Sequence, residues 1–488
     1  MLNISNSIIH TLSACALLLS CDKAPQVEQH PNVLFICVDD LRPELGCYGE
    51  KHVISPNIDK LASSGTLFQN HFVQVPTCGA SRYSMLTGKY PRNRKVLSNN
   101  ATKLLLSDKP EQKRPETFIH HLRRNGYRTV GIGKISHSPD GFVYDYKQEV
   151  SSKKELPYSW DEMLLNTGKW GTGWNAFFSY ADGTNRTQLK KQAMPYELGI
   201  CEDNGYPDGL TAELAIKKIQ ELSASDKPFF LAVGFFKPHL PFNAPEKYWD
   251  MYDEDSIPLS PNPYLPINTK GRGLHNSNEL NSGYLLGDEK PTLSQQVSDA
   301  YARKLRHGYS ACVSYIDTQV GKLLTEIQKQ GLDDNTIVIL WGDHGWHLGD
   351  HLVWGKHTLY DRALRSTLII RDPRTMGGQT INDIVGSIDL YPTIIDLCKV
   401  PAIDSLDGCS LKPLLYEKKD LRERNIMSAF NNSVSLRSSR YRLSKYKNNG
   451  NETFELYDCI EDPNQSINIA DEHPQLLKNM ATELDDLY

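Results

Sequence analysis

The chain has little excess of charge of either sign. Lys and Arg number 54 against 59 Asp and Glu, which gives a formal net charge of -5 over 488 residues. No basic excess indicates a nucleic-acid partner, and no strongly acidic tail indicates a disordered, solvating role. Hydrophobic residues make up 39% and charged residues 23% of the chain. These fractions are typical of globular proteins, so the chain can bury a sizeable core.

Closely paired cysteines and internal repeats are also missing. The ten cysteines include Cys15 and Cys21 near the N-terminus, and no CxxC pair occurs. This excludes the usual spacing of a zinc ribbon. The other eight cysteines are too scattered for the dense framework of a small disulfide-rich protein, although one or two disulfides stay open for an exported chain.

Long apolar runs are missing except for one short run near the N-terminus. Ile8–Ser20 is too short to span a bilayer comfortably, and it has the form of the apolar core of a secretory signal. The Cys21 that follows Ser20 resembles the lipidated cysteine of a bacterial lipobox. Met1–His10 contains none of the Lys or Arg typical of such signals. A plain cleaved signal or a wrongly assigned start is therefore the alternative.

From these features we expect residues 1–21 to be a signal peptide or lipobox and residues 22–30 to be a polar tether. The protein would then be exported to the periplasm, or to the outer membrane or cell surface of a bacterium. A lipid on Cys21 would anchor it to the membrane.

Four apolar runs of strand length are each followed closely by charged or imidazole side chains. The pairs are Asn32–Val38 with Asp39 and Asp40, Arg128–Ile132 with Lys134, Phe229–Gly234 with Lys237 and His239, and Thr336–Leu340 with Asp343 and His344. Continuous apolar runs are typical of strands buried on both faces of a parallel sheet. In such sheets, ligands bind beyond the carboxyl ends of the strands. The polar residues after the runs are therefore candidate site residues.

Helical patterns separate these runs, at Ile58–Ser64, Glu116–Arg124, Leu210–Leu222 and Gln295–Gln330. The alternation predicts an α/β fold with a large, mixed, mostly parallel sheet flanked by helices. Two long segments, His137–Gly209 and Phe242–Lys290, interrupt it. They are interpreted either as walls of a substrate cleft or as surface insertions without a role.

The last part of the chain has a different pattern. Val434–Tyr446 and Thr453–Tyr457 are expected to be strands, and Pro474–Tyr488 is expected to be a terminal helix. These elements predict a small α+β subdomain with an antiparallel sheet over residues 422–488. The main catalytic domain would then cover residues 31–421.

The segment Cys78-Gly79-Ala80-Ser81-Arg82 is followed by Leu86-Thr87-Gly88. It resembles the Cys-x-Pro/Ala-Ser-Arg signature of the type I, formylglycine-dependent sulfatases, which have the alkaline phosphatase-like fold. The resemblance implies that a separate formylglycine-generating maturation enzyme converts Cys78 to 3-oxoalanine. Ala80 stands where Pro is commoner, which leaves the identity of that enzyme open. A helix expected to begin at Ser81 would direct its first amides toward an anionic group.

The conversion makes chemical sense, because a thiolate is a soft nucleophile and poorly matched to a sulfate ester. A hydrated aldehyde carries two oxygens on one carbon. One oxygen attacks sulfur, and the other then loses its proton and expels sulfate. A difficult hydrolysis is thus divided into two easier steps.

Asp39, Asp40, Asp343 and His344 are expected to form a metal site next to Cys78. Oxygen ligands dominate the set, which favours calcium over zinc and leaves magnesium as a weaker alternative. A divalent ion there would bind sulfate oxygens and offset developing charge. The sequence Asp343-His344-Gly345 resembles the second metal motif of the family.

Further basic residues resemble family elements. They lie in Gly133-Lys134-Ile135-Ser136-His137, in Lys237-Pro238-His239, and at Lys356. The resemblance implies that Arg82 and Lys134 hold the nucleophile and the sulfate, and that His137 helps to deprotonate the hydrate. It also implies that His239 and Lys356 contact the sulfate and that one of them protonates the leaving oxygen, since a leaving alkoxide needs a general acid.

Longer stretches, such as Val33–Tyr48 and Phe229–His239, resemble the iduronate 2-sulfatases of the same family. The resemblance implies a sulfated oligosaccharide or polysaccharide as substrate, with a 2-O-sulfated uronic acid as the expected target. Trp346 is expected either to stack on a sugar ring beside His239 and Lys356 or simply to pack. Lys237 is interpreted as a brace for its loop.

Two other functions stay open. A phosphate monoester or diester hydrolase of the alkaline phosphatase superfamily would usually use Ser or Thr with two zinc ions, and Ser81-Arg82 after Cys78 argues against it. A chain whose Cys78 is never converted would instead be a non-catalytic, glycan-binding lipoprotein.

Overall fold

The structure is a computed structural model that describes residues 30–106, 115–269, 272–417, 424–448 and 450–488. The predicted signal, Cys21 and almost the whole tether lie outside the described residues, as does the predicted boundary between residues 421 and 422. Pro31–Tyr488 forms one compact unit. Within the described ranges, no helix combines the length and the apolar character needed to cross a membrane.

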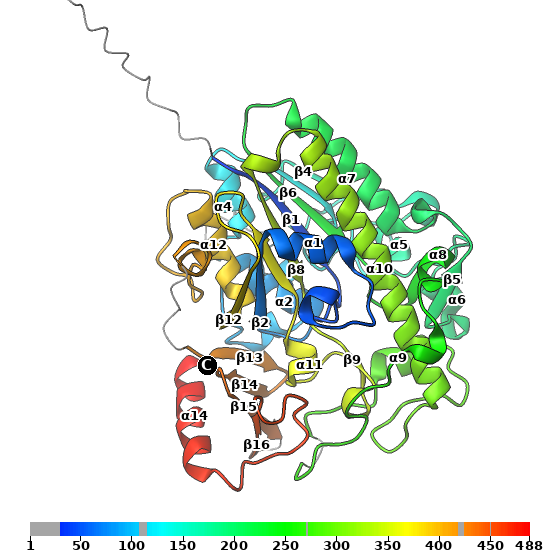
Figure 1. The fold of residues 1–488 in the computed structure, drawn as a ribbon, viewed down its shortest axis with the longest axis vertical. Coiled ribbons are helices and arrows are strands. Elements are labelled where there is room, and N and C mark those ends of the chain that lie inside the picture. Colours follow the sequence, from blue (N-terminus) through cyan, green and yellow to red (C-terminus); the bar gives the residue numbers. More distant parts are fainter. Residues whose placement is uncertain (1–29, 107–114, 270–271, 418–423, 449) are drawn as a thin grey trace, which may run out of the picture. The chain divides into compact units, whose positions relative to one another are not determined.

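An eight-stranded sheet runs through the centre of this unit in the order β12-β2-β11-β8-β1-β6-β3-β4 (Figure 1). Its strands are β1 (Asn32–Val38), β2 (Thr66–Phe72), β3 (Arg128–Gly133), β4 (Glu162–Leu164), β6 (Phe229–Phe235), β8 (Thr336–Gly342), β11 (Leu368–Arg371) and β12 (Gln379–Gly386). All neighbours pair in parallel except β11, which is antiparallel to β8 and β2. The predicted mixed, mostly parallel sheet is confirmed.

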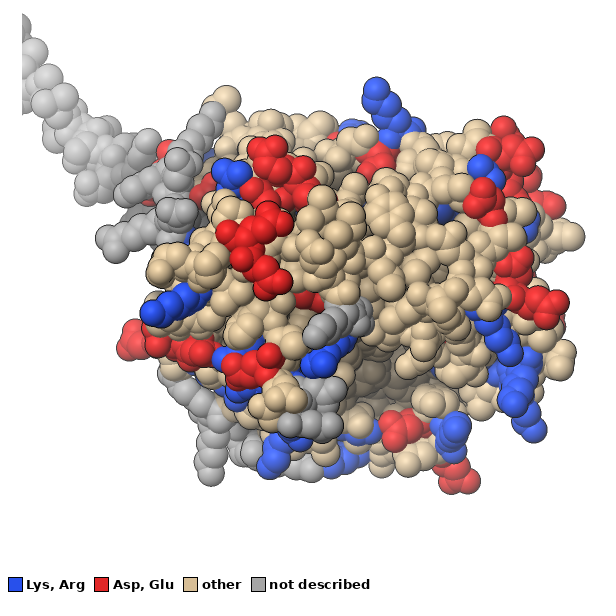
Figure 2. All heavy atoms as spheres, turned by 90° about the horizontal axis from the view of Figure 1, so that it is seen from below, with Lys and Arg blue, Asp and Glu red and all other residues tan. Residues whose placement is uncertain are grey.

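The parallel strands end at the lower side of Figure 1, and Figure 2 shows that side of the molecule. A hollow opens in this face, and Lys, Arg, Asp and Glu side chains all lie around it (Figure 2). Binding sites of α/β sheets lie at this side of the strands, so this is the face on which the predicted site is expected.

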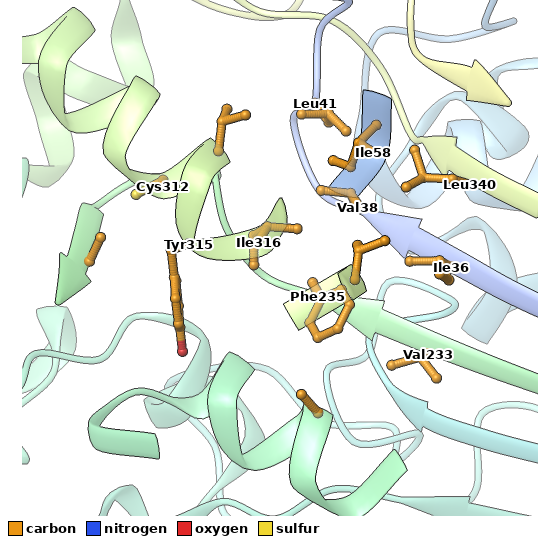
Figure 3. Close-up of a cluster of buried hydrophobic side chains, with 14 of the residues drawn as sticks. Ile36, Val38, Leu41, Ile58, Val233, Phe235, Cys312, Tyr315, Ile316 and Leu340 are labelled. Atoms are coloured by element: carbon orange, nitrogen blue, oxygen red, sulfur yellow. The ribbon is translucent and has the colours of Figure 1, made fainter. Parts of the chain in front are cut away.

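The central strand β1 is apolar at almost every position because both of its faces are buried. Leu34, Ile36 and Val38 enter one core, and Val33, Phe35 and Cys37 enter the other. Successive side chains of a strand point to opposite faces, so a strand covered on both sides needs apolar residues at every position. Figure 3 shows the first core, where Ile316 of α10 (Asp299–Lys329) points toward side chains of the strands.

Helices cover both faces of the sheet. The first core includes residues of α1 (Pro56–Ser64), α7 (Pro207–Ser223) and α10. The second includes residues of α2 (Cys78–Thr87), α4 (Phe118–Arg124), α12 (Leu390–Leu397) and α13 (Lys412–Tyr416). The predicted α1, α4, α7 and α10 are confirmed to within a few residues.

The expected start of α2 at Ser81 is wrong. The helix begins at Cys78, because Thr77 has extended backbone and its carbonyl accepts the Ser81 amide at 2.8 Å. Cys78 therefore lies in the first turn, where amide groups lack helical partners and point outward.

The two long segments predicted as loops contain short elements. The first holds β4, α5 (Gly173–Phe177), α6 (Arg186–Leu189) and β5 (Tyr196–Gly199), and the second holds β7 (Phe242–Pro245), α8 (Glu246–Trp249) and α9 (Asn278–Gly283). Strands β5 and β7 pair in parallel. This pairing joins two segments whose contact is not apparent from either sequence alone.

The remaining short elements before the C-terminal sheet are α3 (Ala101–Leu105), β9 (His347–Leu348), β10 (Trp354–Gly355) and α11 (Asp361–Leu364). The C-terminal residues form an antiparallel sheet of β13 (Ile426–Phe430), β14 (Ser433–Arg437), β15 (Tyr441–Asn448) and β16 (Asn451–Asp458), with α14 (Pro474–Leu487) packed on it. The predicted single strand over Val434–Tyr446 is wrong. It is a hairpin, and its turn is closed by the bond from the Tyr441 amide to Ser438 Oγ at 2.8 Å.

Candidate active site

The neighbouring strands β1 and β8 place the predicted metal ligands side by side. Val38 and Gly342 are partners in the parallel ladder, so Asp39 and Asp40 leave the sheet next to Asp343. The Asp40 amide donates to Asp343 Oδ1 at 2.9 Å. All three carboxylates are fully buried. Asp40 and Asp343 are 303 residues apart in the sequence, and the pairing of β1 with β8 brings them together.

Helix α2 is fastened to these strand ends by Arg82. Its guanidinium lies 2.9 Å from Asp343 Oδ2 and 3.2 Å from Asp39 Oδ1, with no exposed surface on any partner. It also donates to the Lys134 carbonyl after β3 at 2.5 Å. A buried arginine needs such partners because an unpaired buried charge is very costly. Arg82 therefore fixes the first turn of α2, which carries Cys78, over the strand ends.

The Cys78 thiol lies at the centre of the cluster and is 2% exposed. Its Sγ is 3.2 Å from His344 Nε2, 3.3 Å from Lys356 Nζ and 4.0 Å from Asp40 Oδ1. Burial, with Asp39 acting in the same direction, raises the pKa of this thiol well above its usual value. The unmodified residue is thus a protonated thiol and a weak nucleophile. In the converted residue, oxygen atoms would take the place of Sγ.

The acidic side chains and His344 form groups that fit a metal ion. Ligand atoms of Asp40, Cys78 and His344 lie within 4.8 Å of one another, as do those of Asp39, Asp40 and Asp343. His344 Nδ1 faces the Gly345 carbonyl at 2.9 Å, which leaves Nε2 directed at the cluster. Burial raises the pKa of Asp40 to about 7, against the effect of Lys356. An added cation would stabilise the ionised carboxylate, and this oxygen-rich set suits a hard ion.

Lys134 and His137 follow β3 as predicted. Lys134 Nζ lies 2.5 Å from Asp39 Oδ2 and 4.1 Å from the Phe177 ring centre. His137 is half-buried, its ring packs at 5.3 Å on Trp174, and its Nδ1 is buried without a hydrogen-bond partner among the described residues. Burial, with Lys134, lowers the pKa of His137 well below its usual value. A neutral imidazole with an unused nitrogen can accept a proton.

Lys356 and His239 approach the cluster from the other side. Lys356 Nζ lies 3.0 Å from Asp40 Oδ1. His239 Nε2 lies 3.9 Å from Asp40 Oδ2, while its Nδ1 faces the Leu240 carbonyl at 2.7 Å. Burial, together with Lys356, lowers the pKa of His239 to about 4.

Glu279 is a site residue that the sequence did not reveal. Its carboxylate lies 3.1 Å from His239 Nε2 and 3.5 Å from Lys356 Nζ. Although burial opposes it, Lys356 and His239 hold the pKa of Glu279 well below its usual range. No motif marks this residue, and the only signal was its place in a long segment interpreted as a cleft wall.

Two further predictions concern Trp346 and Lys237. Trp346 is 1% exposed, and Lys356 Nζ lies 5.1 Å from its ring centre. The expected stacking of Trp346 on a sugar finds no open ring face in this structure, because Lys356 and the core cover it. It packs instead. Lys237 donates to the His239 and Pro241 carbonyls at 3.1 and 2.6 Å, which braces the loop as interpreted.

Comparison with known proteins places this site in a class. The profile of the Sulfatase family matches residues 31–400, and that of the N-sulphoglucosamine sulphohydrolase C-terminal family matches residues 349–488. The chain therefore belongs to the sulfatase family and is a sulfuric ester hydrolase. The matched range 31–400 includes Cys78, Arg82, Asp343, His344 and Lys356.

Among individual relatives, mouse (Mus musculus) iduronate 2-sulfatase is 31% identical over 423 residues, which cover 80% of this chain and 72% of the relative. A phosphonate monoester hydrolase of Agrobacterium radiobacter has a similar fold, with a TM-score of 0.73 at 22% identity over 94% of this chain and 95% of that one. A protein solved with its substrate D-glucosamine-2-N,6-O-disulfate has a TM-score of 0.70 at 22% identity, over 94% and 97% of the two chains. These two structures support the alkaline phosphatase-like fold.

Proposed function

We propose that this sulfatase removes sulfate from a sulfated carbohydrate, with a 2-O-sulfated uronic acid as the target residue, and that it uses calcium and a formylglycine derived from Cys78. The observation that carries the proposal is the position of Cys78 Sγ, 3.2 Å from His344 Nε2 and 3.3 Å from Lys356 Nζ at the ends of β1 and β8. The 31% identity with an iduronate 2-sulfatase supports the choice of sugar.

Asp39, Asp40, Asp343 and His344 would hold the calcium ion, which would supply charge neutralisation for the sulfate oxygens. The formylglycine hydrate would supply the attacking oxygen and later a second hydroxyl for expelling sulfate.

The chain's own basic residues divide the remaining work. Arg82 and Lys134 hold the nucleophile position against Asp39 and Asp343. His137 accepts a proton from the hydrate, since its Nδ1 is free of other partners among the described residues. Lys356 binds the sulfate. His239 gives a proton from Nε2 to the leaving sugar oxygen, and the Glu279 carboxylate at 3.1 Å from Nε2 opposes the burial that lowers the pKa of this histidine.

The test is sulfate release from a panel of heparan, dermatan, ulvan and carrageenan oligosaccharides, with the protein co-expressed with a formylglycine-generating enzyme. We expect release from a 2-O-sulfated uronate and a Cys78 peptide mass that shows the aldehyde. The Cys78→Ala variant is the matched control. Absence of release from every 2-O-sulfated uronate would refute the proposed sugar, while an unconverted thiol in active protein would refute the proposed nucleophile.

Two competing functions are separated by simple measurements. A phosphate ester hydrolase of the same fold would bind two zinc ions per chain, whereas we expect one calcium ion by elemental analysis. A non-catalytic glycan-binding protein would keep the Cys78 thiol in its native host.

We also propose that the chain is exported, with Cys21 as a lipid anchor. The apolar run Ile8–Ser20 before Cys21 supports this. Mass spectrometry of the mature N-terminus tests it, and an unprocessed Met1 would refute it.

A further inference from the structure

Arg186, at the start of α6, holds a guanidinium among aromatic rings with almost no polar partner. The guanidinium carbon lies 3.4 Å from the Phe178 ring centre, 5.6 Å from that of Tyr284 and 6.0 Å from that of Tyr146. Its one hydrogen bond among the described residues goes to Tyr284 Oη at 3.3 Å. No carboxylate of the described residues pairs with it. Most of its five N–H donors therefore have no partner among the described residues.

Other arginines that lie over tyrosine rings in this protein have more polar partners than Arg186. Arg365, over Tyr48, donates to the Gln69 carbonyl at 2.7 Å and to Gln69 Oε1 at 2.9 Å. Others pair with a carboxylate. Arg92 lies over Tyr90 and also bonds to Asp407 at 2.7 Å. Arg440 lies over Tyr441 and also bonds to Asp458 at 2.7 Å. Both are more exposed than half-buried Arg186. A cation with less access to water has more need of a counter-charge, so the missing partner of Arg186 points to an anionic ligand.

The aromatic rings connect Arg186 to the catalytic histidines. The ring centre of Phe178 lies 3.4 Å from the Arg186 guanidinium and 6.1 Å from the centre of the His239 ring. The separation of Arg186 from His239 is therefore smaller than the length of a disaccharide. Trp174 packs on His137 at 5.3 Å and on Tyr146 at 6.2 Å. We call Tyr146, Trp174, Phe178 and Tyr284 the aromatic wall.

One side chain of the aromatic wall is exposed, and two separate segments of the chain contribute to the wall. Tyr146 is 42% exposed, while Phe178 and Tyr284 are 5% exposed. Tyr284 directly follows α9, which carries Glu279 at 3.1 Å from His239. Two segments far apart in the sequence thus fix one guanidinium beside the reaction centre, and an exposed phenol ring stands next to it.

We propose that Arg186 binds a second anionic group of the saccharide, a carboxylate or a second sulfate, while Tyr146 contacts a sugar ring. This inference rests on the proposed function and adds a specificity-determining pair to it. The planar guanidinium suits two-point binding of either oxyanion. The aromatic rings hold it in place, so little side-chain freedom is lost on binding.

The test compares wild type with Arg186→Gln and Arg186→Lys on matched substrates. The substrates are a 2-O-sulfated uronate disaccharide, its carboxyl-reduced form, the same disaccharide with a second sulfate, and 4-methylumbelliferyl sulfate, which has no second anion. Arg440→Gln is the control, because it removes an arginine that also lies over a tyrosine but has its own carboxylate. Melting temperatures check that each variant folds.

We expect Arg186→Gln to lower kcat/KM on disaccharides that carry a second anion by about 10- to 100-fold, since a charge-assisted hydrogen bond is lost. Cleavage of 4-methylumbelliferyl sulfate should stay unchanged, and Arg186→Lys should lose less. Calorimetric binding of the same disaccharides to the Cys78→Ala background should show the same loss. If carboxyl reduction removes the Arg186 dependence, the ligand group is the carboxylate; if only omission of the second sulfate does so, it is that sulfate.

Equal losses on the disaccharides and on 4-methylumbelliferyl sulfate would overturn the inference, because Arg186 would then only support the structure. So would a wild type that binds mono-anionic and di-anionic saccharides equally well. Neither result touches the proposed function, which fails instead if no sulfate ester at all is cleaved by converted protein.

Discussion

The protein buries two clusters of charge that differ in whether their polar groups converge on one reactive atom. At the strand ends, the three buried carboxylates face Arg82, Lys134 and Lys356. At the junction with the C-terminal sheet, Asp361 is held by Arg437 and Arg442. Both clusters are largely removed from water, so burial and ion pairing by themselves do not separate a reactive site from a structural one.

Both clusters leave a buried nitrogen without a partner among the described residues, Arg442 Nη2 at the junction and His137 Nδ1 at the strand ends. The difference lies in whether the polar groups converge on one reactive atom. At the junction, Arg442 and Gln465 donate to Asp361 Oδ1 and Arg437 donates to Oδ2. Nearby Glu455 Oε2 accepts from the hydroxyls of three tyrosines, namely Tyr360, Tyr446 and Tyr457. At the strand ends, His344 Nε2 and Lys356 Nζ converge on the Cys78 thiol at 3.2 and 3.3 Å. Carboxylates that are held by arginines, glutamine and tyrosines stabilise the fold, whereas basic groups that converge on one thiol can act on a ligand bound there.

The largest effect is expected for Cys78→Ala. Activity should fall at least about 10³-fold, because loss of a nucleophile removes the covalent route. The free energy of unfolding should change little, since the thiol makes no bond that holds the fold. Sulfate release and urea unfolding measure the two quantities. Cys37→Ala in β1 is the control. We expect it to lower the free energy of unfolding and to leave sulfate release unchanged. If Cys78→Ala released sulfate at the wild-type rate, the strand-end cluster would not be the reactive one.

Metal removal should also affect only the strand-end cluster. Treatment with a calcium chelator should lower sulfate release by about 100-fold or more, since the carboxylates lose the ion that offsets their charge and that of the sulfate. Calcium should restore activity and raise the melting temperature, because an ion that binds only the folded state stabilises it. Restoration by zinc but not by calcium would contradict the proposed ion.

At the junction, Asp361→Asn should destabilise the protein by about 3–5 kcal/mol, because Arg437 and Arg442 keep buried charge without a counter-charge. Protein that remains folded should keep its kcat/KM. Urea unfolding measures the loss. The control is Asp458→Asn, which breaks the exposed pair with Arg440 and should cost no more than about 1 kcal/mol. A selective loss of activity in Asp361→Asn would place the junction in the catalytic machinery.

The smallest effect is expected for Glu279→Gln, which removes the carboxylate beside His239 Nε2. We expect kcat on a sugar sulfate to fall about 10-fold, since Glu279 opposes the burial that drives the proton off His239. An aryl sulfate should be affected less, because its leaving group needs less protonation. Glu246→Gln, on exposed α8, is the control. Equal losses on both substrates would show that Glu279 does not act through His239.

Much of the sheet was predictable from residue type alone. The runs that became β1, β3, β6 and β8 are apolar at nearly every position, and such runs can only be covered on both faces. The start of α2 was missed, although Thr is a residue type favoured before a helix; Thr77 makes no side-chain capping bond in the structure. The hairpin within Val434–Tyr446 was missed because its strands and its polar turn share one alternating pattern.

For the site, local motifs identified Cys78, Arg82, Asp343 and His344, since each belongs to a short pattern with its own chemistry. Motifs gave no information about Glu279 or Arg186, which lie in segments without regular periodicity. Trp346 is a case in which the sequence left two interpretations open. Stacking on a sugar and packing were both open for it, and its 1% exposure with Lys356 over the ring supports packing.

The sequence by itself determined the strands of the central sheet and marked Cys78 and the acidic residues as candidates for the nucleophile and the metal ligands, because these depend on apolar runs and on residues adjacent in the chain. Only the tertiary structure decided which long-range groups meet. The register of β1 with β8 set Asp40 against Asp343, and the contact of two irregular segments set Arg186 and Glu279 beside the histidines. Such contacts depend on packing between distant segments, and no local pattern of residues specifies that packing.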